Sequence, residues 1–486
     1  MRIHPRSARR TSAALLLLMV AAPGVPGALG PGALAAQQPA AADTAPALAA
    51  DGGPGQASPQ ARQVTLEEAV ELAMHNNPSL RQSKSNVDQA RYQRLAAYGA
   101  FMPSVSAGYG YSNSSVARLD PTQQALTTTS YSFQLNGSYD LFTGLRRFSQ
   151  MKAANLNVQA QQSSFREARY QTLLDVKTAY YDAVANRDLV SVEAARVKRQ
   201  QDQVDFVRQQ LQLGRATRSD LLSSQVDLNN AKLALLNARN SARSSTFALA
   251  QAIGVDQPVA PVAEASLRID SLSYDRDQLQ SLAMSQAPSV QSARASAQAA
   301  RAQVSSAKSS FLPDLTLAGG YSWQAQDFPP ENRSWSIRLT GSIPLFNGLQ
   351  RESQLFEAQA QSDAANAQER SAELALRKNV DDAYNQVQTA MAGADLAQTS
   401  VQLSQENLRV TQERYRLGLS TILDLQSAQI NLEQAQVDLV QRKFDYRLGL
   451  AQLEALLGGA LPGSSPLPGA PGGGAATLKT TDGEMP

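Results

Sequence analysis

The sequence predicts a mainly α-helical fold in which four β-strands per chain combine with the strands of other subunits to form a membrane β-barrel. Three features of the 486-residue chain support this prediction. A long unit occurs twice, each unit contains a very long stretch almost free of glycine and proline, and each unit contains two stretches of alternating apolar and polar residues. These features are typical of an extended, duplicated protein rather than a compact globular one.

The N-terminal residues have the composition of a secretory signal peptide. Four arginines within the first ten residues precede an apolar stretch at 13–22 and a group of small residues. This apolar stretch is about half of the roughly 20 residues that a membrane-spanning helix needs, so a membrane anchor is the weaker alternative. We therefore expect a signal peptide at 1–36, cleaved near Ala35 or Ala36.

The composition of the chain excludes several partners and cofactors. The leader holds four of the 44 lysines and arginines and none of the 42 acidic residues, so the remaining chain has a net charge of about −2. It has no clustered basic face for nucleic acid. Without cysteine it has no disulfide, no thiolate metal site and no lipid-bearing residue after the leader. No later run approaches 18 apolar residues, which leaves a β-barrel as the way to cross a membrane.

The two units are related by a nearly constant spacing in the sequence. The segment Leu-Phe-Thr-Gly-Leu at 141–145 recurs 204 residues later as Leu-Phe-Asn-Gly-Leu at 345–349. Before the strands the spacing is 210 residues, as Phe101 and its counterpart Phe311 show. We infer that one ancestral unit was duplicated and that the six-residue difference lies in one loop.

This spacing divides the chain into repeats and flanks. We expect a first repeat at 63–260 and a second repeat at 261–457. The linker at 37–62 is rich in Pro, Ala and Gln, and the tail at 458–486 is rich in Gly and Pro. Neither flank has enough apolar surface to fold alone, so we expect both to be disordered.

Four stretches of alternating residues predict the strands. In the clearest of them, Phe133, Leu135 and Tyr139 share one face, while Gln134 and Asn136 lie opposite. A soluble sheet with one buried face shows the same pattern. In lipid, an open four-stranded sheet would expose two unpaired edges, and single-chain barrels begin at about eight strands, so a barrel requires several subunits. The four stretches are 105–111, 133–141, 315–323 and 335–345.

Two uninterrupted stretches predict very long helices. Residues 145–213 contain no glycine or proline, and residues 349–417 contain only Gly393. A helix of roughly 65 residues would be about 100 Å long. Apolar residues recur at alternating spacings of three and four, diluted by Gln and Ala, which indicates helices packed side by side. An ordinary coiled-coil rod is the alternative interpretation.

Each long helix is followed by a short turn and a second helix. Gly214 and Gly418 are suited to the left-handed conformation that ends a helix. A Thr-x-x-Asp pattern follows each glycine and predicts a capping box at the start of the next helix. We therefore expect two antiparallel helical hairpins whose tips contain Leu213, Gly214, Thr217 and Asp220 in one repeat and Leu417, Gly418, Thr421 and Asp424 in the other.

These motifs resemble those of TolC-type outer-membrane efflux proteins. The tip sequence Tyr-Arg-Leu-Gly at 415–418 is followed by Asp424, Leu425 and Ala428. The strand-to-helix sequence Ile-Pro-Leu-Phe-Asn-Gly at 343–348 is the second hallmark. The resemblance covers both repeats, over roughly 64–457.

The resemblance implies a homotrimer in the outer membrane lipid. Four strands per chain would form one twelve-stranded barrel, continued by a long α-helical tunnel across the periplasm. The tunnel would dock a periplasmic adaptor protein that is joined to an inner-membrane pump of RND, ABC or MFS type. By the same resemblance, the docking residues are Leu213, Gly214, Leu417 and Gly418.

The resemblance also implies a gate at the tips. Asp424 would contribute to an acidic ring that favours cations, although the capping box gives this residue a second role. Asp220 and Tyr415 match residues of a closing network. Two positions depart from the best-known members, because Ser420 replaces an arginine and Ser427 replaces a second ring aspartate. Closure would then depend on other pairs, such as Arg215 or Arg218 with Asp424 of a neighbouring subunit.

No group of residues indicates catalysis, a metal site or a cofactor. His75 is the one histidine after the leader, and Asp381 and Asp382 are adjacent in a predicted helix, where their side chains diverge. We therefore expect a passive exit duct of an efflux pump or a type I secretion system, and not an enzyme. The alternative is an exported, structural coiled-coil envelope protein without a pore. The sequence does not indicate the transported substrate.

Overall fold

The computed structural model describes residues 61–119, 126–262, 267, 269 and 274–459. The signal peptide expected at 1–36 lies outside the described residues, and so do nearly all of the expected linker and tail. The last residue of the expected linker is described, because Arg62 begins a short strand. At the other end, Gly458 caps the last helix.

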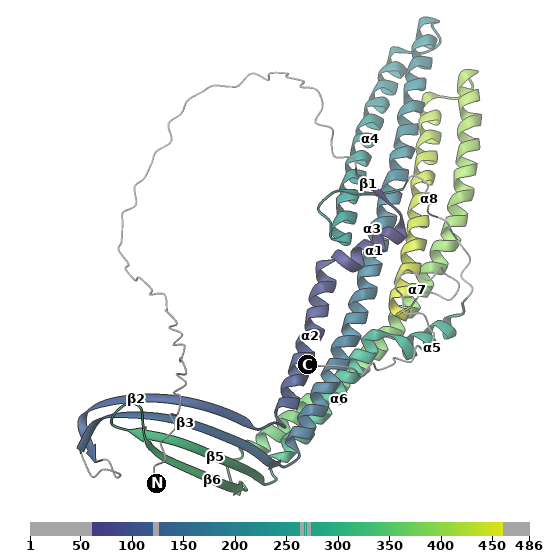
Figure 1. Ribbon diagram of the computed structural model, residues 1–486. Coiled ribbons are helices and arrows are strands. Elements are labelled where there is room, and N and C mark those ends of the chain that lie inside the picture. The colour runs from purple at the N-terminus through teal and green to yellow at the C-terminus, as the bar shows by residue number, and fades with distance from the viewer. Residues whose placement is uncertain (1–60, 120–125, 263–266, 268, 270–273, 460–486) are drawn as a thin grey trace, which may run out of the picture. The chain divides into compact units, whose positions relative to one another are not determined.

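The described residues form the same series of seven elements twice (Figure 1). The duplication predicted from the sequence therefore extends to every element. The first repeat consists of β1 (Arg62–Val64), α1 (Leu66–Asn76), α2 (Pro78–Gly99), β2 (Ser104–Leu119), β3 (Leu126–Thr143), α3 (Arg146–Gln212) and α4 (Arg218–Ile253). The second repeat consists of β4 (Val259–Pro261), α5 (Arg276–Gln286), α6 (Pro288–Ser309), β5 (Asp314–Ala325), β6 (Asn332–Ser342), α7 (Gln350–Arg416) and α8 (Ile422–Leu457).

The four predicted strands form one antiparallel sheet in the order β2-β3-β5-β6. Leu135 of β3 lies opposite Tyr321 of β5, and the rings of Phe133 and Trp323 are 5.1 Å apart across the same pair of strands. The first hairpin is longer, with strands of 16 and 18 residues against 12 and 11, which accounts for the change in spacing between the repeats. The described sheet therefore has two open edges, β2 and β6.

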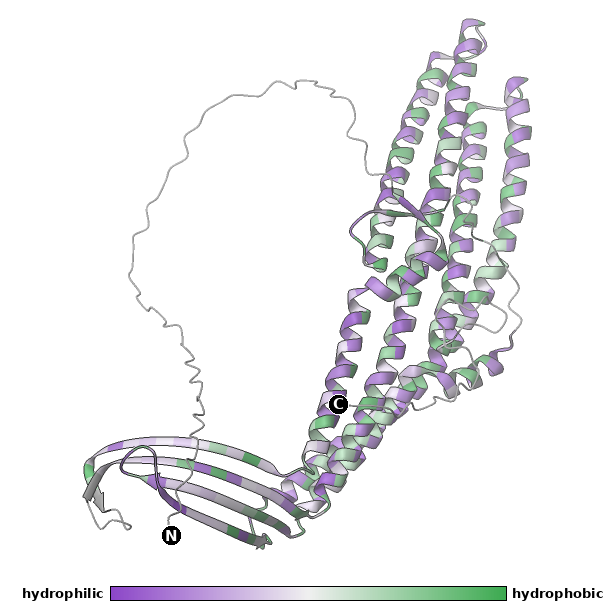
Figure 2. Cartoon of the chain, in the orientation of Figure 1, coloured by the Kyte–Doolittle hydropathy of each residue, from purple (hydrophilic) through white to green (hydrophobic). Residues whose placement is uncertain are grey.

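Neither face of this sheet is covered by the rest of the described chain. No side chain of β5 or β6 is buried, and Trp335, Ile337 and Leu339 of β6 are all more than half exposed. A soluble sheet needs one buried apolar face, so the described arrangement disagrees with that alternative. Figure 2 shows that hydrophobic and hydrophilic residues are interspersed along the strands and the helices. Within the described residues, no helix is both long enough and apolar enough to cross a membrane.

The strands β3 and β6 are each linked to the following long helix by a tight corner. Gly144 and Leu145 are both left-handed, with φ of 58° and 68°, and so are Gly348 and Leu349, with φ of 68° and 64°. A left-handed leucine is uncommon because its Cβ is crowded in this conformation. The same Gly-Leu pair therefore has the same backbone conformation at both corners.

The long helices confirm the prediction from the uninterrupted stretches. α3 and α7 each contain 67 residues, and α4 and α8 each contain 36. Helix α3 contacts α4 and α8, and α8 contacts α7, so the helices lie in the row α4-α3-α8-α7 (Figure 1). Nearer the sheet, contacts arrange the row α2-α3-α6-α7. The repeats therefore meet where α3 packs on α8 and α6, which we call the inter-repeat interface.

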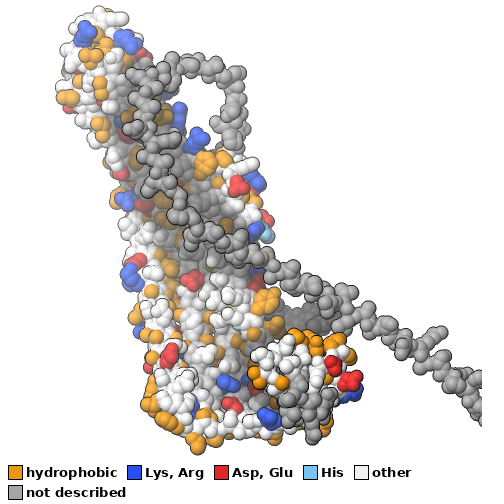
Figure 3. Space-filling view, turned by 90° about the vertical axis from the view of Figure 1, so that its left-hand side faces the viewer, with side chains coloured by type: hydrophobic (Ala, Val, Ile, Leu, Met, Phe, Trp, Pro, Cys, Tyr) orange, Lys and Arg blue, Asp and Glu red, His pale blue; other side chains and the backbone are white. Residues whose placement is uncertain are grey.

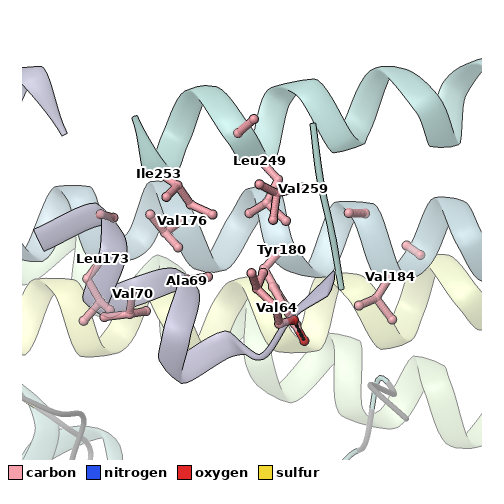
Figure 4. Close-up of a cluster of buried hydrophobic side chains, with 14 of the residues drawn as sticks. Val64, Ala69, Val70, Leu173, Val176, Tyr180, Val184, Leu249, Ile253 and Val259 are labelled. Atoms are coloured by element: carbon pink, nitrogen blue, oxygen red, sulfur yellow. Dashed lines mark hydrogen bonds between the residues drawn. The ribbon is translucent and has the colours of Figure 1, made fainter. Parts of the chain in front are cut away.

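The largest core cluster lies midway along the helices (Figure 4). Val176 and Tyr180 of α3 pack against Leu249 and Ile253 of α4. The Tyr180 hydroxyl donates a hydrogen bond to the carbonyl oxygen of Val64, at 3.4 Å. The short strands β1 and β4 pair in parallel over this core. The sequence analysis did not predict them, because three residues are too few to show an alternating pattern.

Candidate functional site at the hairpin tips

The two hairpin tips lie at the end of the helices farthest from the sheet (Figure 1). At each tip a glycine has the predicted left-handed conformation, with φ of 70° at Gly214 and 74° at Gly418. The backbone then closes the helix in the same way twice. Arg215 N–H donates to the Gln210 carbonyl and Leu419 N–H donates to the Arg414 carbonyl, both at 2.8 Å. The turns predicted from the sequence are therefore confirmed.

Both predicted capping boxes are present. At the first tip the Asp220 N–H donates to Thr217 Oγ1 at 3.1 Å, and the Thr217 N–H donates to Asp220 Oδ2 at 2.8 Å. At the second tip the corresponding bonds between Asp424 and Thr421 measure 3.2 and 2.9 Å. The two aspartates therefore have the same role in starting α4 and α8.

Asp424 has additional hydrogen bonds that Asp220 lacks among the described contacts. The hydroxyls of Thr421 and Ser420 both donate to Asp424 Oδ2, at 2.8 and 3.1 Å. The backbone N–H of Thr421 and then these hydroxyls hold the pKa of Asp424 below its usual range. The exposed carboxylate is therefore fully charged at neutral pH, and capping and charge are compatible in one residue. In the first repeat the position equivalent to Ser420 is Ala216.

Tyr415 connects the two tips. Its ring lies 6.0 Å from the ring of Phe206 on α3, and the guanidinium of Arg416 lies 6.0 Å from the centre of the same Phe206 ring. Burial raises the pKa of the Tyr415 hydroxyl, and the negative charge of Asp220 raises it further. Tyr415 therefore senses the charge of Asp220 electrostatically. The sequence did not indicate a role for Phe206. Its counterpart in the second repeat is Val410, so the aromatic ring occurs in one repeat only.

The tips differ in the side chains that they expose. Leu213 and Leu417 are 65% and 72% exposed. The second tip adds two further exposed leucines, Leu419 and Leu423. The equivalent positions of the first tip hold Arg215 and Ser219. Among the described residues, neither Arg215 nor Arg218 forms an ion pair. One tip is thus basic and the other is apolar, although their backbones match.

Polar contacts across the inter-repeat interface hold the hairpins together below the tips. Beside this interface, Gln426 of α8 also reaches α4, where it donates to Ser223 Oγ at 3.1 Å and to Asp227. Gln200 of α3 donates to Gln429 Oε1 of α8 at 2.9 Å. Further along the same interface, α3 and α8 are joined by two ion pairs, Arg196 with Glu433 and the buried Lys177 with Glu454.

The other candidate groups do not come together. Within the described ranges, no cluster of three or more His, Asp or Glu side chains is arranged to hold a metal ion. His75 lies in the last turn of α1. Asp381 pairs with Arg276 and Asp382 pairs with Lys378, so the adjacent aspartates point to different partners.

Comparisons with known proteins agree with this architecture. The chain matches the sequence profile of the outer membrane efflux protein family over residues 69–255 and 279–459. Protein CyaE of Bordetella pertussis is 26% identical over 344 residues, which cover 68% of this chain and 70% of CyaE. The alkaline protease secretion protein AprF of Pseudomonas aeruginosa is 24% identical over 304 residues, covering 58% of this chain and 61% of AprF. The structure of the outer membrane protein VceC of Vibrio cholerae matches with a TM-score of 0.71 and 22% identity, covering 81% of this chain and 96% of VceC.

Proposed function

Because the chain belongs to the outer membrane efflux protein family, we propose that it forms one subunit of an outer-membrane exit duct whose periplasmic entrance is made by the hairpin tips. The family consists of outer-membrane channels with a periplasmic tunnel. Such a duct is a passive conduit, and its energy comes from a pump elsewhere. The observation that carries the proposal is the pair of matched tips, of which the second holds a charged Asp424.

The open sheet supports assembly into a homotrimer. β2 and β6 present unpaired backbone groups at the two edges of a sheet whose faces are uncovered. Unpaired backbone groups are costly in outer-membrane lipid, and pairing between subunits removes them. Three chains would thereby close a twelve-stranded barrel. The alternative of an envelope rod without a pore gives no reason for strands of this kind.

We assign the gate to Asp424, Asp220 and Tyr415. A ring of Asp424 carboxylates at a narrow entrance would attract cations and repel anions. Tyr415 packs against Phe206 and lies within the electrostatic influence of Asp220, so it is suited to holding the second tip against the first. Arg215 and Arg218 are suited to pairing with Asp424 of a neighbouring subunit. Such a pair would take over the closing role of the arginine that Ser420 replaces in this chain.

The exposed tip residues form the docking surface for a periplasmic adaptor. Leu213 and Leu417 project from turns fixed by Gly214 and Gly418. Exposed leucines at the end of a rigid hairpin are typical of a protein contact. The adaptor would in turn join an inner-membrane pump of RND, ABC or MFS type. Movement through such a duct requires no chemistry from this chain, and we propose that it is not an enzyme.

Single-channel recording in planar lipid bilayers tests the duct and its gate together. We expect the wild-type protein to conduct with a preference for cations, and we expect Asp424→Asn and Asp424→Ala to weaken that preference. Glu406→Gln is the matched control, because it removes an exposed negative charge from α7 that is already paired with Arg409. Stable oligomers that never conduct would contradict the duct, and equal effects of all three variants would contradict the assignment of Asp424.

A further inference from the structure

A pocket opens where α8 ends and α6 begins. Its volume is about 320 Å3, and α3, α6, α7 and α8 all contribute to its lining. The end of α8 abuts the start of α6, because a Cβ on Gly458 would lie 2.7 Å from Pro288 Cδ. Asp382 of the lining is 34 residues before the end of α7 at Arg416, which is about 50 Å along a helix. The pocket is therefore a feature of one chain and is separate from the hairpin tips.

The buried part of this lining is apolar, and the exposed part is acidic or neutral polar. Pro288 and Ala383 are buried, and Leu456 is half-buried. The exposed part includes Glu167 of α3 and Asp382 of α7, and the described lining contains no lysine or arginine. An apolar cavity with a few polar groups is typical of a site for a small molecule. The two carboxylates indicate that this molecule is positively charged.

The two carboxylates differ in their present partners. Asp382 pairs with Lys378, one turn earlier on α7, but both side chains are exposed. Exposed pairs contribute little stability, so a cationic ligand can take the place of Lys378. Glu167 forms no ion pair among the described residues, and its partial burial raises the pKa of its carboxyl group. The adjacent Arg166 donates instead to Gln291 of α6, at 2.7 Å. A cation in the pocket would therefore stabilise the ionised form of Glu167.

The helix ends at the pocket have no strong preference of their own for a charged ligand. The last turn of α8 is partially negative and the first turn of α6 is partially positive, so their effects oppose each other where they abut. Pro288 is the first residue of α6 and has no N–H to donate to an anion. On the side of the chain seen in Figure 3, acidic and basic side chains are interspersed along the helices. In the pocket, by contrast, acidic side chains alone determine the sign of the charge.

The pocket opens on the face of α7 that points away from α5. The α7 residues of the lining are spaced by three and four and therefore share one face. They are Asn379, Asp382, Ala383 and Gln386. On the opposite face of α7, Asp381 pairs with Arg276 of α5, and Tyr384 packs on the core cluster to which α5 contributes. In the proposed duct α5 lies outside, because an added helix on the inside would narrow the conduit. The pocket then faces the conduit.

We propose that this pocket binds organic cations that carry an apolar body, and that it does so on the wall of the conduit. The proposal rests on the proposed duct and names a class of solute that the duct recognises. The cationic group would lie beside Glu167 and Asp382, and the apolar body would lie against Pro288 and Ala383. Binding should be weak, because a solute in a conduit must also be able to leave its site.

Cysteine labelling tests the charge of the pocket, because the chain contains no cysteine and Ser289 lines the pocket. We compare the labelling rates of Ser289→Cys with a trimethylammonium and a sulfonate methanethiosulfonate, each relative to its rate with a free thiol. The cationic reagent should be favoured by about fivefold or more, because a unit charge a few ångström away changes the local concentration by about that factor. Glu167→Gln and Asp382→Asn should each reduce this preference. Asp395→Asn is the matched control, since Asp395 is exposed and lies fourteen residues after Asp381, on the opposite face of α7.

Protection by a ligand tests binding itself. The probe is 4-phenylbutylammonium, which should slow the reaction of Ser289→Cys with the neutral reagent N-ethylmaleimide several-fold. The anion 4-phenylbutyrate has the same apolar body and should give little protection. Neither probe should protect Ser285→Cys, which is exposed on α5. Added to planar bilayers, 4-phenylbutylammonium should also reduce the single-channel current of the wild type more than that of Glu167→Gln. This last measurement needs no cysteine and decides if Ser289→Cys fails to fold.

The outcomes separate this inference from the proposed function. A conducting protein that 4-phenylbutylammonium does not protect, or that both probes protect equally, would overturn the cation site and leave the duct standing. Equal effects of Asp395→Asn and Asp382→Asn on the labelling preference would overturn it too. Protection without any loss of current would show that the pocket lies outside the conduit. Selective protection in a protein that never conducts would support the cation site and contradict the duct.

Discussion

At the inter-repeat interface Lys177 and Glu454 form a buried ion pair, whereas the equivalent positions of the other repeat hold Asp381, which pairs with Arg276, and Ala250, which is buried in a core cluster. The backbone at the two locations is the same, since α3 and α7 match in length and so do α4 and α8. The duplicated unit has thus kept its backbone signals while its side chains changed.

This difference indicates which interactions belong to the folding of one chain. A buried ion pair contributes little net stability, but each partner becomes costly when it is left alone. Such a pair suits an interface that always forms, because α3 and α8 belong to one molecule. At an edge that is exposed until subunits meet, leucines carry no such penalty, since a single exposed apolar side chain is tolerated.

Glu454→Ala should produce the largest effect. It leaves the Lys177 ammonium buried without its carboxylate, and removal of one partner of a buried pair costs about 3–5 kcal/mol. The measurement is the midpoint of chemical denaturation in detergent. Asp382→Ala, which breaks the exposed pair with Lys378, should cost at most about 1 kcal/mol.

Replacement of both partners sharpens this test. Lys177→Met combined with Glu454→Leu removes the two charges together and should recover most of the lost stability. Equal destabilisation by Glu454→Ala and Asp382→Ala would show that Lys177 reaches water in the folded protein. The distinction between the inter-repeat interface and the outer edge would then fail at this position.

Alanine substitutions at the two strand-to-helix corners should give the next largest difference in stability. A Cβ on Gly144 would lie 2.5 Å from the carbonyl oxygen of Ser309 and 2.8 Å from Leu312 Cβ, whereas a Cβ on Gly348 would meet nothing within 4 Å. Both glycines are left-handed, so both alanine variants carry the strain of about 1 kcal/mol. Gly144→Ala adds overpacking of about 1–3 kcal/mol.

In the separated subunit, Gly144→Ala should therefore be less stable to chemical denaturation than Gly348→Ala. The surroundings of Gly348 change if a second molecule packs there as α6 packs on Gly144. In that case Gly348→Ala should lower the stability of the oligomer more than that of the separated chain. If Gly144→Ala and Gly348→Ala had the same stability both in the separated chain and in the oligomer, the corner at Gly144 would accommodate the extra Cβ at no cost.

Local signals explain why so much of the fold was predictable from the sequence. Gly214 and Gly418, each followed by a Thr-x-x-Asp pattern, specify the turn and the next helix through bonds between near neighbours. The absence of helix-breaking residues specifies α3 and α7 in the same way. Repetition adds a second, independent copy of each signal, which is why the element order could be read with few errors.

The contacts of the candidate site were less predictable because they join distant residues. Phe206 and Tyr415 lie on different helical hairpins, 209 residues apart in the sequence, and nothing in the periodicity of either helix marks their contact. Ser420 looked like the loss of a charged group, although its hydroxyl donates to Asp424. Lys177 offered a signal that was overlooked, because it is a lysine directly beside the apolar seam residue Val176.

The two tip glycines should have equal and smaller effects. Neither Gly214 nor Gly418 has an atom within 4 Å of the position of a Cβ, so alanine adds only the strain of the left-handed backbone. We expect about 1 kcal/mol of destabilisation for each variant. Hydrogen exchange of the first turn of α4 and of α8 measures each tip separately. A much larger effect at Gly418 would show that the apolar tip already packs against another surface.

The smallest effect concerns the titration of the second tip. Hydrogen bonds from Thr421 and Ser420 stabilise the ionised form of Asp424 and lower its pKa, so the carboxylate keeps its charge until the pH falls below the usual range of aspartate.

Thr421→Val removes the hydroxyl donor while keeping the shape of the side chain, and the pKa of Asp424 should therefore rise towards its ordinary value of about 3.9. The pH at which half of the cation preference is lost, measured from reversal potentials, should rise in this variant. Thr217→Val makes the same change at the first tip and should leave that midpoint unaltered. Both variants weaken a capping box, so a shift of the midpoint in both would show that the cation preference depends on the geometry of the tips. A shift in Thr421→Val alone would show that the cation preference depends on the charge of Asp424.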